Sequence, residues 1–120
     1  MKIKYGIDLG TTNSAISKVT DGNSEIVKNP AGQDTTPSCV AFTPRKAVKI
    51  GLDAINFSRE VRNRPNSFIE FKRTMGTEKK YYSSNMEKDY SSEELSSEVL
   101  KYLKSFTQDD KFKSVVVTIP

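Results

Sequence analysis

The chain has no histidine and no tryptophan, and its 120 residues include a single cysteine, Cys39. Without histidine, its own side chains cannot form a histidine-based catalytic triad or a histidine-containing metal cluster. One cysteine cannot form an internal disulfide. Nothing in the sequence indicates a lowered thiol pKa, so a small buried side chain is favoured over a reactive thiol at this position.

Long apolar runs are also missing. No stretch reaches the length needed to cross a membrane, and Lys2 and Lys4 are not followed by the apolar segment of a secretory signal. We therefore expect a cytoplasmic protein without membrane contact. The 19 Lys and Arg exceed the 15 Asp and Glu by only four, and they are scattered along the chain, so no nucleic-acid partner is expected.

The two commonest nucleotide-binding motifs are absent, because the chain contains neither Gly-x-x-x-x-Gly-Lys-Ser/Thr nor Gly-x-Gly-x-x-Gly. It has instead GIDLGTTNS at residues 6–14. A glycine and small hydroxyl residues at a corner leave backbone N–H groups open to an anion, and Asp8 beside that anion would require a cation such as Mg²⁺ between them. The same residues suit an ordinary turn held by local hydrogen bonds, and the stretch alone leaves both interpretations open.

Short apolar stretches predict strands in the first half of the chain. Apolar residues alternate over residues 3–9, and further short stretches follow at 15–19 and 25–27, which predicts a three-stranded antiparallel meander. The composition of residues 36–42 predicts a further strand, and residues 48–50 are expected to pair with it. A length of 120 residues allows one modest core, so we expect one small domain or part of a larger one.

The second half of the chain predicts helices and a last strand. Helices are expected over residues 53–62 and 66–75, and the polar segment 77–90 is expected to be a surface loop. Residues 91–94 fit a capping box that opens a long amphipathic helix. Residues 114–119 are apolar on both faces, which predicts an interior strand of a sheet that continues beyond this chain.

Lys72 is a second candidate for chemistry. On the helix predicted over residues 66–75, Phe68, Phe71 and Met75 share a face, and Lys72 falls within that apolar sector. Such a lysine either extends past its neighbours to solvent or reaches a fixed negative partner. The pattern alone favours the first, and a phosphate nearby would favour the second.

GIDLGTTNS closely resembles the first phosphate motif of the actin-like ATPase superfamily, in the form found in the seventy-kilodalton heat-shock chaperones of DnaK type. Four other segments agree with these chaperones in order and approximate spacing: TTPSCVAFT at 35–43, FKRTMG at 71–76, SSEELSSEVLKYLK at 91–104 and VVVTIP at 115–120. The likeness spans essentially the whole chain.

The resemblance implies an α/β fragment of the ribonuclease H-like, actin-like ATPase fold. Residues 1–37 and 113–120 would form part of the core subdomain, with the antiparallel meander and a return strand. Residues 38–112 would form a small peripheral α/β subdomain. The segment 77–90 is shorter than the insertion of the common bacterial chaperone, as in the short, specialised members of the family.

The resemblance also implies an ATP site with Mg²⁺. The residues that match the loop around the β- and γ-phosphates of ATP or ADP are Gly10, Thr11, Thr12 and Asn13, with the Thr11 hydroxyl closest to the transferred phosphate. Asp8 matches the carboxylate that holds Mg²⁺ through water. Lys72 matches the catalytic lysine that neutralises the γ-phosphate and helps to place the attacking water.

By the same resemblance, the parent protein is a stress-response chaperone that uses ATP to bind and release unfolded polypeptides. A J-domain co-chaperone and a nucleotide exchange factor are its implied partners. The chain lacks the second phosphate motif and the adenosine-binding segments, so we expect no ATPase activity from it alone. Two alternatives remain: a sugar kinase or other ATPase of the superfamily, and a non-enzymatic module that binds a co-chaperone.

Overall fold

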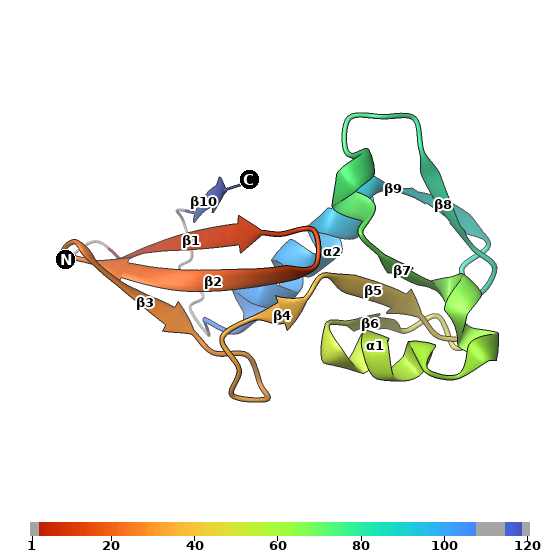
Figure 1. Ribbon diagram of the computed structural model, residues 1–120, viewed down its shortest axis with the longest axis horizontal. Helices are drawn as coiled ribbons and strands as arrows, with labels where there is room; N and C mark the ends of the chain where they lie inside the picture. Colours follow the sequence, from red (N-terminus) through yellow and green to blue (C-terminus); the bar gives the residue numbers. More distant parts are fainter. Residues whose placement is uncertain (1–2, 108–114, 119–120) are drawn as a thin grey trace.

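The computed structural model describes residues 3–107 and 115–118 of the chain. β1 (Ile3–Leu9), β2 (Asn13–Thr20) and β3 (Asn23–Val27) form the predicted antiparallel meander, which is confirmed (Figure 1). β10 (Val115–Thr118) pairs with β1 in parallel, giving the order β10-β1-β2-β3. The last predicted strand is thus confirmed over these four residues. It lies at the edge of the described sheet, whereas its two-sided apolar pattern predicted an interior position.

The alternation in β1 explains which face of the meander is buried. Tyr5, Ile7 and Leu9 are buried on one face, and Lys4 and Asp8 on the other face are exposed. A strand places successive side chains on opposite faces, so a period of two in the sequence creates one apolar face. This face joins the main hydrophobic core of the molecule.

A short segment carries the chain from the first sheet to the second. β4 (Thr36–Pro37) pairs with the start of β2, and after Ser38 the chain enters β5 (Cys39–Phe42). β5 is the central strand of a separate sheet between β6 (Val48–Ile50) and β7 (Ser67–Ile69). The strand predicted over 36–42 is therefore divided at Ser38, and its predicted pairing with residues 48–50 is confirmed.

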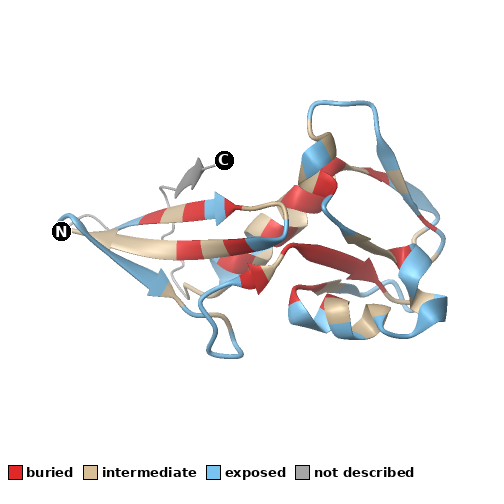
Figure 2. Ribbon diagram, viewed as in Figure 1, coloured by how far each residue is buried: buried red, intermediate tan, exposed pale blue. Residues whose placement is uncertain are grey.

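β5 is buried along its whole length, as Figure 2 shows. Cys39 and Ala41 pack with Ala54 of helix α1 (Leu52–Ser58). Val40 and Phe42 join the main core on the other side. Because both faces of this strand are covered, its sequence is apolar throughout and shows no alternation.

The two helices predicted in the middle of the chain are corrected by the structure. α1 ends at Ser58, and a 3-10 helix, η1 (Val61–Asn66), follows it. The helix predicted over 66–75 is wrong, because β7 is followed by Glu70 in the left-handed conformation, with φ of 54°, and then by a second 3-10 helix, η2 (Phe71–Thr74). Pairing of β7 with β5 overrides the local helical pattern.

The loop predicted over residues 77–90 is also wrong. This segment contains an antiparallel hairpin of β8 (Lys80–Ser83) and β9 (Lys88–Ser91). Tyr90 stacks on Phe42, with ring centroids 4.5 Å apart, and so ties the hairpin to the core. Burial of one aromatic side chain offsets the high polarity of the segment.

Helix α2 (Ser92–Ser105) confirms the last predicted helix. Its predicted capping box is present: the Glu94 N–H donates to Ser91 Oγ, and the Ser91 N–H donates to Glu94 Oε1, both at 3.1 Å. The Ser91 N–H, with Lys88, holds the pKa of Glu94 below its usual range. The α2 helix contacts strands of both main sheets and so joins the two parts of the molecule (Figure 1). Among the described residues, no helix is long and apolar enough to cross a membrane.

Candidate functional site

The corner between β1 and β2, here called the Gly10 corner (residues 10–13), is too tight for a side chain at its first position. A Cβ atom placed on Gly10 would lie 2.1 Å from the backbone oxygen of Asn13. Real Cβ atoms do not approach backbone oxygen so closely. Gly10, the second glycine of GIDLGTTNS, is therefore required because the chain approaches itself so closely, whatever the corner binds.

The polar residues of the Gly10 corner face accessible space. Thr12 and Asn13 are exposed, and Thr11 is half-buried. A cavity of about 340 Å³ lies beside them. The residues that line it are Thr11, Thr12, Asn13, Pro37, Ser38, Cys39, Ile55, Ile69 and Glu70. The corner of the first sheet and the ends of β5 and β7 in the second thus border the same cavity.

Asp8 lies on β1, two residues before the corner, and its side chain is exposed. Among the residues that the structure describes, no cluster of three or more His, Cys, Asp or Glu could hold a metal ion. A single carboxylate near a corner of N–H and hydroxyl donors suits Mg²⁺, which keeps several waters and shares its ligands with phosphate. It does not suit a metal bound entirely by protein side chains.

Lys72 lies on η2, two residues after Glu70, which lines the cavity. Its side chain is half-buried, and Phe71 beside it is fully buried. The structure thus brings the segment that carries Lys72 to the border of the cavity, although Lys72 is not one of the lining residues. The helical face from which Lys72 was inferred does not exist, because Phe68 belongs to β7.

Ser38 is a residue beside the Gly10 corner that the sequence alone did not indicate. It is 3 % exposed, its Oγ donates to the Gly10 oxygen at 2.9 Å, and its N–H donates to the Thr12 oxygen at 2.8 Å. Ser14 Oγ lies 2.8 Å from Ser38 Oγ. These contacts span 24 to 28 residues of sequence, so no local pattern could have indicated them.

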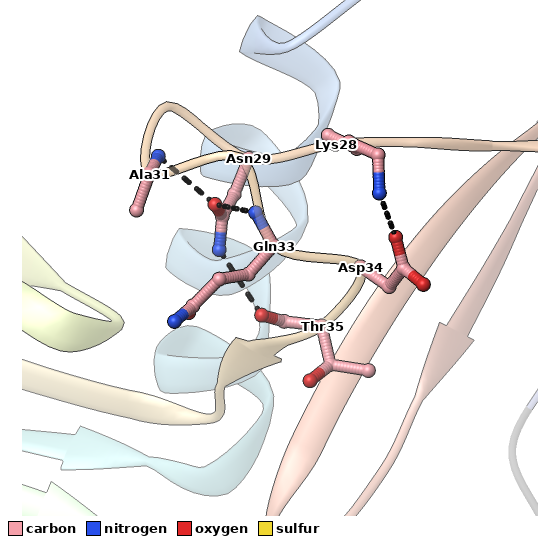
Figure 3. Close-up of polar contacts among 6 residues, drawn as sticks. All are labelled: Lys28, Asn29, Ala31, Gln33, Asp34 and Thr35. Carbon is pink, nitrogen blue, oxygen red and sulfur yellow. Dashed lines mark hydrogen bonds and ion pairs between the residues drawn. The ribbon is translucent and has the colours of Figure 1, made fainter.

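The connection from β3 to β4 places Ser38 and is itself fixed by Asn29 (Figure 3). Asn29 Oδ1 accepts from the N–H groups of Ala31 and Gln33, at 3.0 and 2.9 Å. Its Nδ2 donates to the Thr35 oxygen at 3.0 Å. The Asn29 side chain therefore closes this exposed loop, and the chain then enters β4 beside the Gly10 corner.

Cys39 lines the cavity but is 1 % exposed. Burial raises the pKa of its thiol to about 11, so the nucleophilic thiolate is scarce at neutral pH. The structure confirms the prediction of a buried side chain, and the raised pKa is consistent with a thiol of low reactivity.

Most of the chain matches one known protein family. The model of the Hsp70 protein family matches residues 4–90, which is well over half of the chain. The chain belongs to the Hsp70 family. The resemblance found in the five sequence segments is thereby confirmed, and a sugar kinase is not supported. The mixed α/β structure is consistent with part of the actin-like ATPase fold that Hsp70 membership implies.

Curated Hsp70 relatives from mycoplasmas match nearly the whole chain. The "Chaperone protein DnaK" of Mycoplasmopsis synoviae (strain 53) is 40% identical over 122 residues, which cover 99% of this chain and 20% of the relative. The protein of the same name from Metamycoplasma hominis is 40% identical over 119 residues, which cover 96% of this chain and 19% of the relative. The chain therefore spans about a fifth of the length of these relatives.

Proposed function

We propose that this chain is the N-terminal part of the ATP-binding domain of a DnaK-type chaperone, and that it supplies part of an ATP site completed by the rest of that protein. The observation that carries the proposal is the Gly10 corner, whose exposed hydroxyl and amide groups border a cavity shared with the segment before Lys72. Membership in the Hsp70 family, which binds nucleotide generally with Mg²⁺, supports it.

The Gly10 corner would hold the β- and γ-phosphates of ATP. Backbone N–H groups of a tight corner carry partial positive charge, and the hydroxyls of Thr11 and Thr12 add two further donors. The Thr11 hydroxyl would lie nearest to the transferred phosphate. Asn13 ends the corner at the start of β2, where its backbone is anchored in the sheet.

Asp8 would hold Mg²⁺ through water, at the end of β1 next to the phosphates. A bound Mg²⁺ offsets the negative charge of the phosphate oxygens. Lys72 would place its ammonium against the γ-phosphate and help to position the attacking water. This is electrostatic stabilisation of phosphoryl transfer, to which the side chain contributes a fixed charge.

The domain division that we propose has its boundary where the chain changes sheets. Residues 1–37 and 113–120 would belong to a ribonuclease H-like core, and residues 38–112 to a peripheral subdomain. The step from β4 in the first sheet to β5 in the second, across Ser38, supports this boundary. Residues 1–2, 108–114 and 119–120 of this division lie outside the described residues.

In the full-length chaperone, hydrolysis at this site would switch the affinity for unfolded polypeptides, which bind through a domain that this chain does not contain. A J-domain co-chaperone and a nucleotide exchange factor would regulate the cycle in the cytoplasm. The relatives named "Chaperone protein DnaK" support this role. The 120 residues alone would lack ATPase activity, because the second half of the phosphate clamp lies elsewhere in the protein.

Asp8→Asn tests whether Asp8 contributes to Mg²⁺ binding at the proposed site. In the full-length protein, we expect Mg²⁺-dependent release of phosphate from ATP. Asp8→Asn should raise the Mg²⁺ concentration that gives half the maximal rate by about tenfold, because the contact of the Asp8 carboxylate with hydrated Mg²⁺ is weakened. Phosphate release is measured across a Mg²⁺ titration.

The matched control is Asp21→Asn, at the exposed turn between β2 and β3, where Asp21 has φ of 48° and asparagine fits equally well. It should leave the Mg²⁺ titration unchanged. An identical titration for Asp8→Asn and the unsubstituted protein would remove Asp8 from the metal site. Absence of any Mg²⁺-dependent hydrolysis by the unsubstituted full-length protein would overturn the proposed function itself.

A further inference from the structure

Ser38 occupies a position where the two main sheets and the Gly10 corner meet. It is the single residue between β4 and β5, and it is buried. Its N–H and its hydroxyl both donate to the corner, to the carbonyl oxygens of Thr12 and Gly10 respectively. The Ser38 hydroxyl also forms a hydrogen bond with the Ser14 hydroxyl, with the two Oγ atoms 2.8 Å apart. This one residue between the two sheets thus binds two of the four peptide carbonyls of the corner.

These two hydrogen bonds fix the direction of two backbone N–H groups. A peptide unit is planar, and in the trans form its C=O and the following N–H point in opposite directions. The described chain contains no cis peptide bond. With the Gly10 and Thr12 carbonyls directed at Ser38, the N–H groups of Thr11 and Asn13 must point away from it.

Ser38 also relates the corner to the segment that carries Lys72. The next residue, Cys39, is paired with Ile69 in the ladder between β5 and β7. Ile69 is followed by Glu70, whose left-handed backbone turns the chain into η2 and Lys72. The path from the corner to Lys72 therefore runs through Ser38 and the Cys39–Ile69 pair of the second sheet.

We propose that Ser38 is a positioning residue for the phosphate site. Its hydroxyl holds the Gly10 carbonyl so that the N–H groups of the corner face the nucleotide phosphates at a fixed place relative to Lys72. This proposal rests on the proposed function, because it assigns Ser38 a role in the same ATP site. In this role Ser38 would act through the Gly10 corner and not by direct contact with the reacting atoms.

A positioning role differs from a purely structural role in what it does to different ligands. Loss of the hydroxyl frees the first peptide unit of the corner to rotate, which weakens contacts to the phosphates and leaves contacts to the nucleoside intact. A general loss of stability would weaken the binding of both ligand parts alike. The informative quantity is therefore the affinity for ATP relative to the affinity for adenosine.

The experiment uses the full-length protein with Ser38→Ala, and measures the Kd of ATP with Mg²⁺ and the Kd of adenosine by competition with a fluorescent nucleotide. We expect ATP to bind about tenfold more weakly, because the Thr11 N–H is no longer held toward the phosphates and its hydrogen bond to a charged group is weakened. Adenosine should bind as before. If Ser38→Ala does not fold, Ser38→Cys carries the same test, because a thiol fills similar space and is a weak donor.

Ser83→Ala is the matched control. Ser83 is equally buried and also donates one hydrogen bond, to Asn66 Oδ1 at 2.6 Å, and accepts one, from the Met86 N–H at 3.2 Å, but it lies on β8 away from the corner. It should leave both affinities unchanged. Equal losses of ATP and adenosine affinity in Ser38→Ala, or an unchanged ATP affinity, would overturn the positioning role. If the unsubstituted protein binds ATP no more tightly than adenosine, the proposed function fails instead.

Discussion

Substitution of Gly10 by alanine is expected to abolish detectable ATP binding by the full-length protein. The added Cβ would lie 2.1 Å from the Asn13 oxygen, so residues 10–13 must separate. Separation moves the Thr11 and Asn13 N–H groups and breaks the contacts of the corner with Ser38. The strain should also lower the free energy of unfolding of this chain by about 3 kcal/mol. ATP binding is measured by calorimetry, and stability by urea unfolding.

The control for Gly10→Ala is Gly6→Ala on β1, the strand that leads into the Gly10 corner. A Cβ on Gly6 would have no atom within 4 Å, and its φ does not lie in the left-handed region. We expect this variant to bind ATP like the unsubstituted protein and to unfold within about 0.5 kcal/mol of it. Wild-type ATP affinity in Gly10→Ala would show that the tight corner is not needed for phosphate binding.

Lys72→Ala is expected to reduce ATP turnover by the full-length protein by about 100-fold or more, with a much smaller change in ATP affinity. A single fixed charge that acts on the transition state has effects of this size. ATP retains its contacts with the Gly10 corner in this variant, so binding persists. Single-turnover hydrolysis separates the chemical step from binding and product release.

Arg73→Ala is the natural comparison for Lys72→Ala. Both residues lie on η2, but the Arg73 side chain is 67% exposed and pairs with Glu70 at 3.7 Å. An exposed pair of this kind contributes little, and we expect turnover within twofold of the unsubstituted protein, about the effect of a weak surface contact. Equal losses in the two variants would show that general positive charge on η2 matters, and not the specific position of Lys72.

The parts of the fold that could be predicted from sequence are those whose signals are local. The alternation in β1 defines one buried face, and the Asp21-Gly22 turn between β2 and β3 has both residues at positive φ, as this dipeptide favours. The capping box of α2 is likewise contained within residues 91–94. In each case the residues that make the contact are near neighbours in sequence.

The errors occurred where distant residues decide the local structure. The spacing of Phe68 predicts a helix, but Phe68 pairs opposite Val40 in the ladder between β5 and β7. The polarity of residues 77–90 predicts a loop, but Tyr90 stacks on Phe42 and fixes a hairpin. Sequence propensity gives no information about such partners, and tertiary contacts outweigh it.

The candidate site was predicted in part for the same reason. Gly10 and its neighbours are contiguous, so the chemistry of an anion-binding corner was visible in the sequence alone. Ser38 acts on that corner from 28 residues away and was missed. Lys72 was inferred from a helical face that does not exist, and its assignment now depends on the Hsp70 match and on the place of η2 beside the cavity.

The most direct test of the account is a crystal structure of the full-length protein with Mg²⁺ and a non-hydrolysable ATP analogue. The account predicts that the β- and γ-phosphates accept hydrogen bonds from the Gly10 corner, that Asp8 reaches Mg²⁺ through water, and that Lys72 Nζ contacts the γ-phosphate. Phosphates bound elsewhere, with the Gly10 corner and Lys72 making no contact with them, would contradict it.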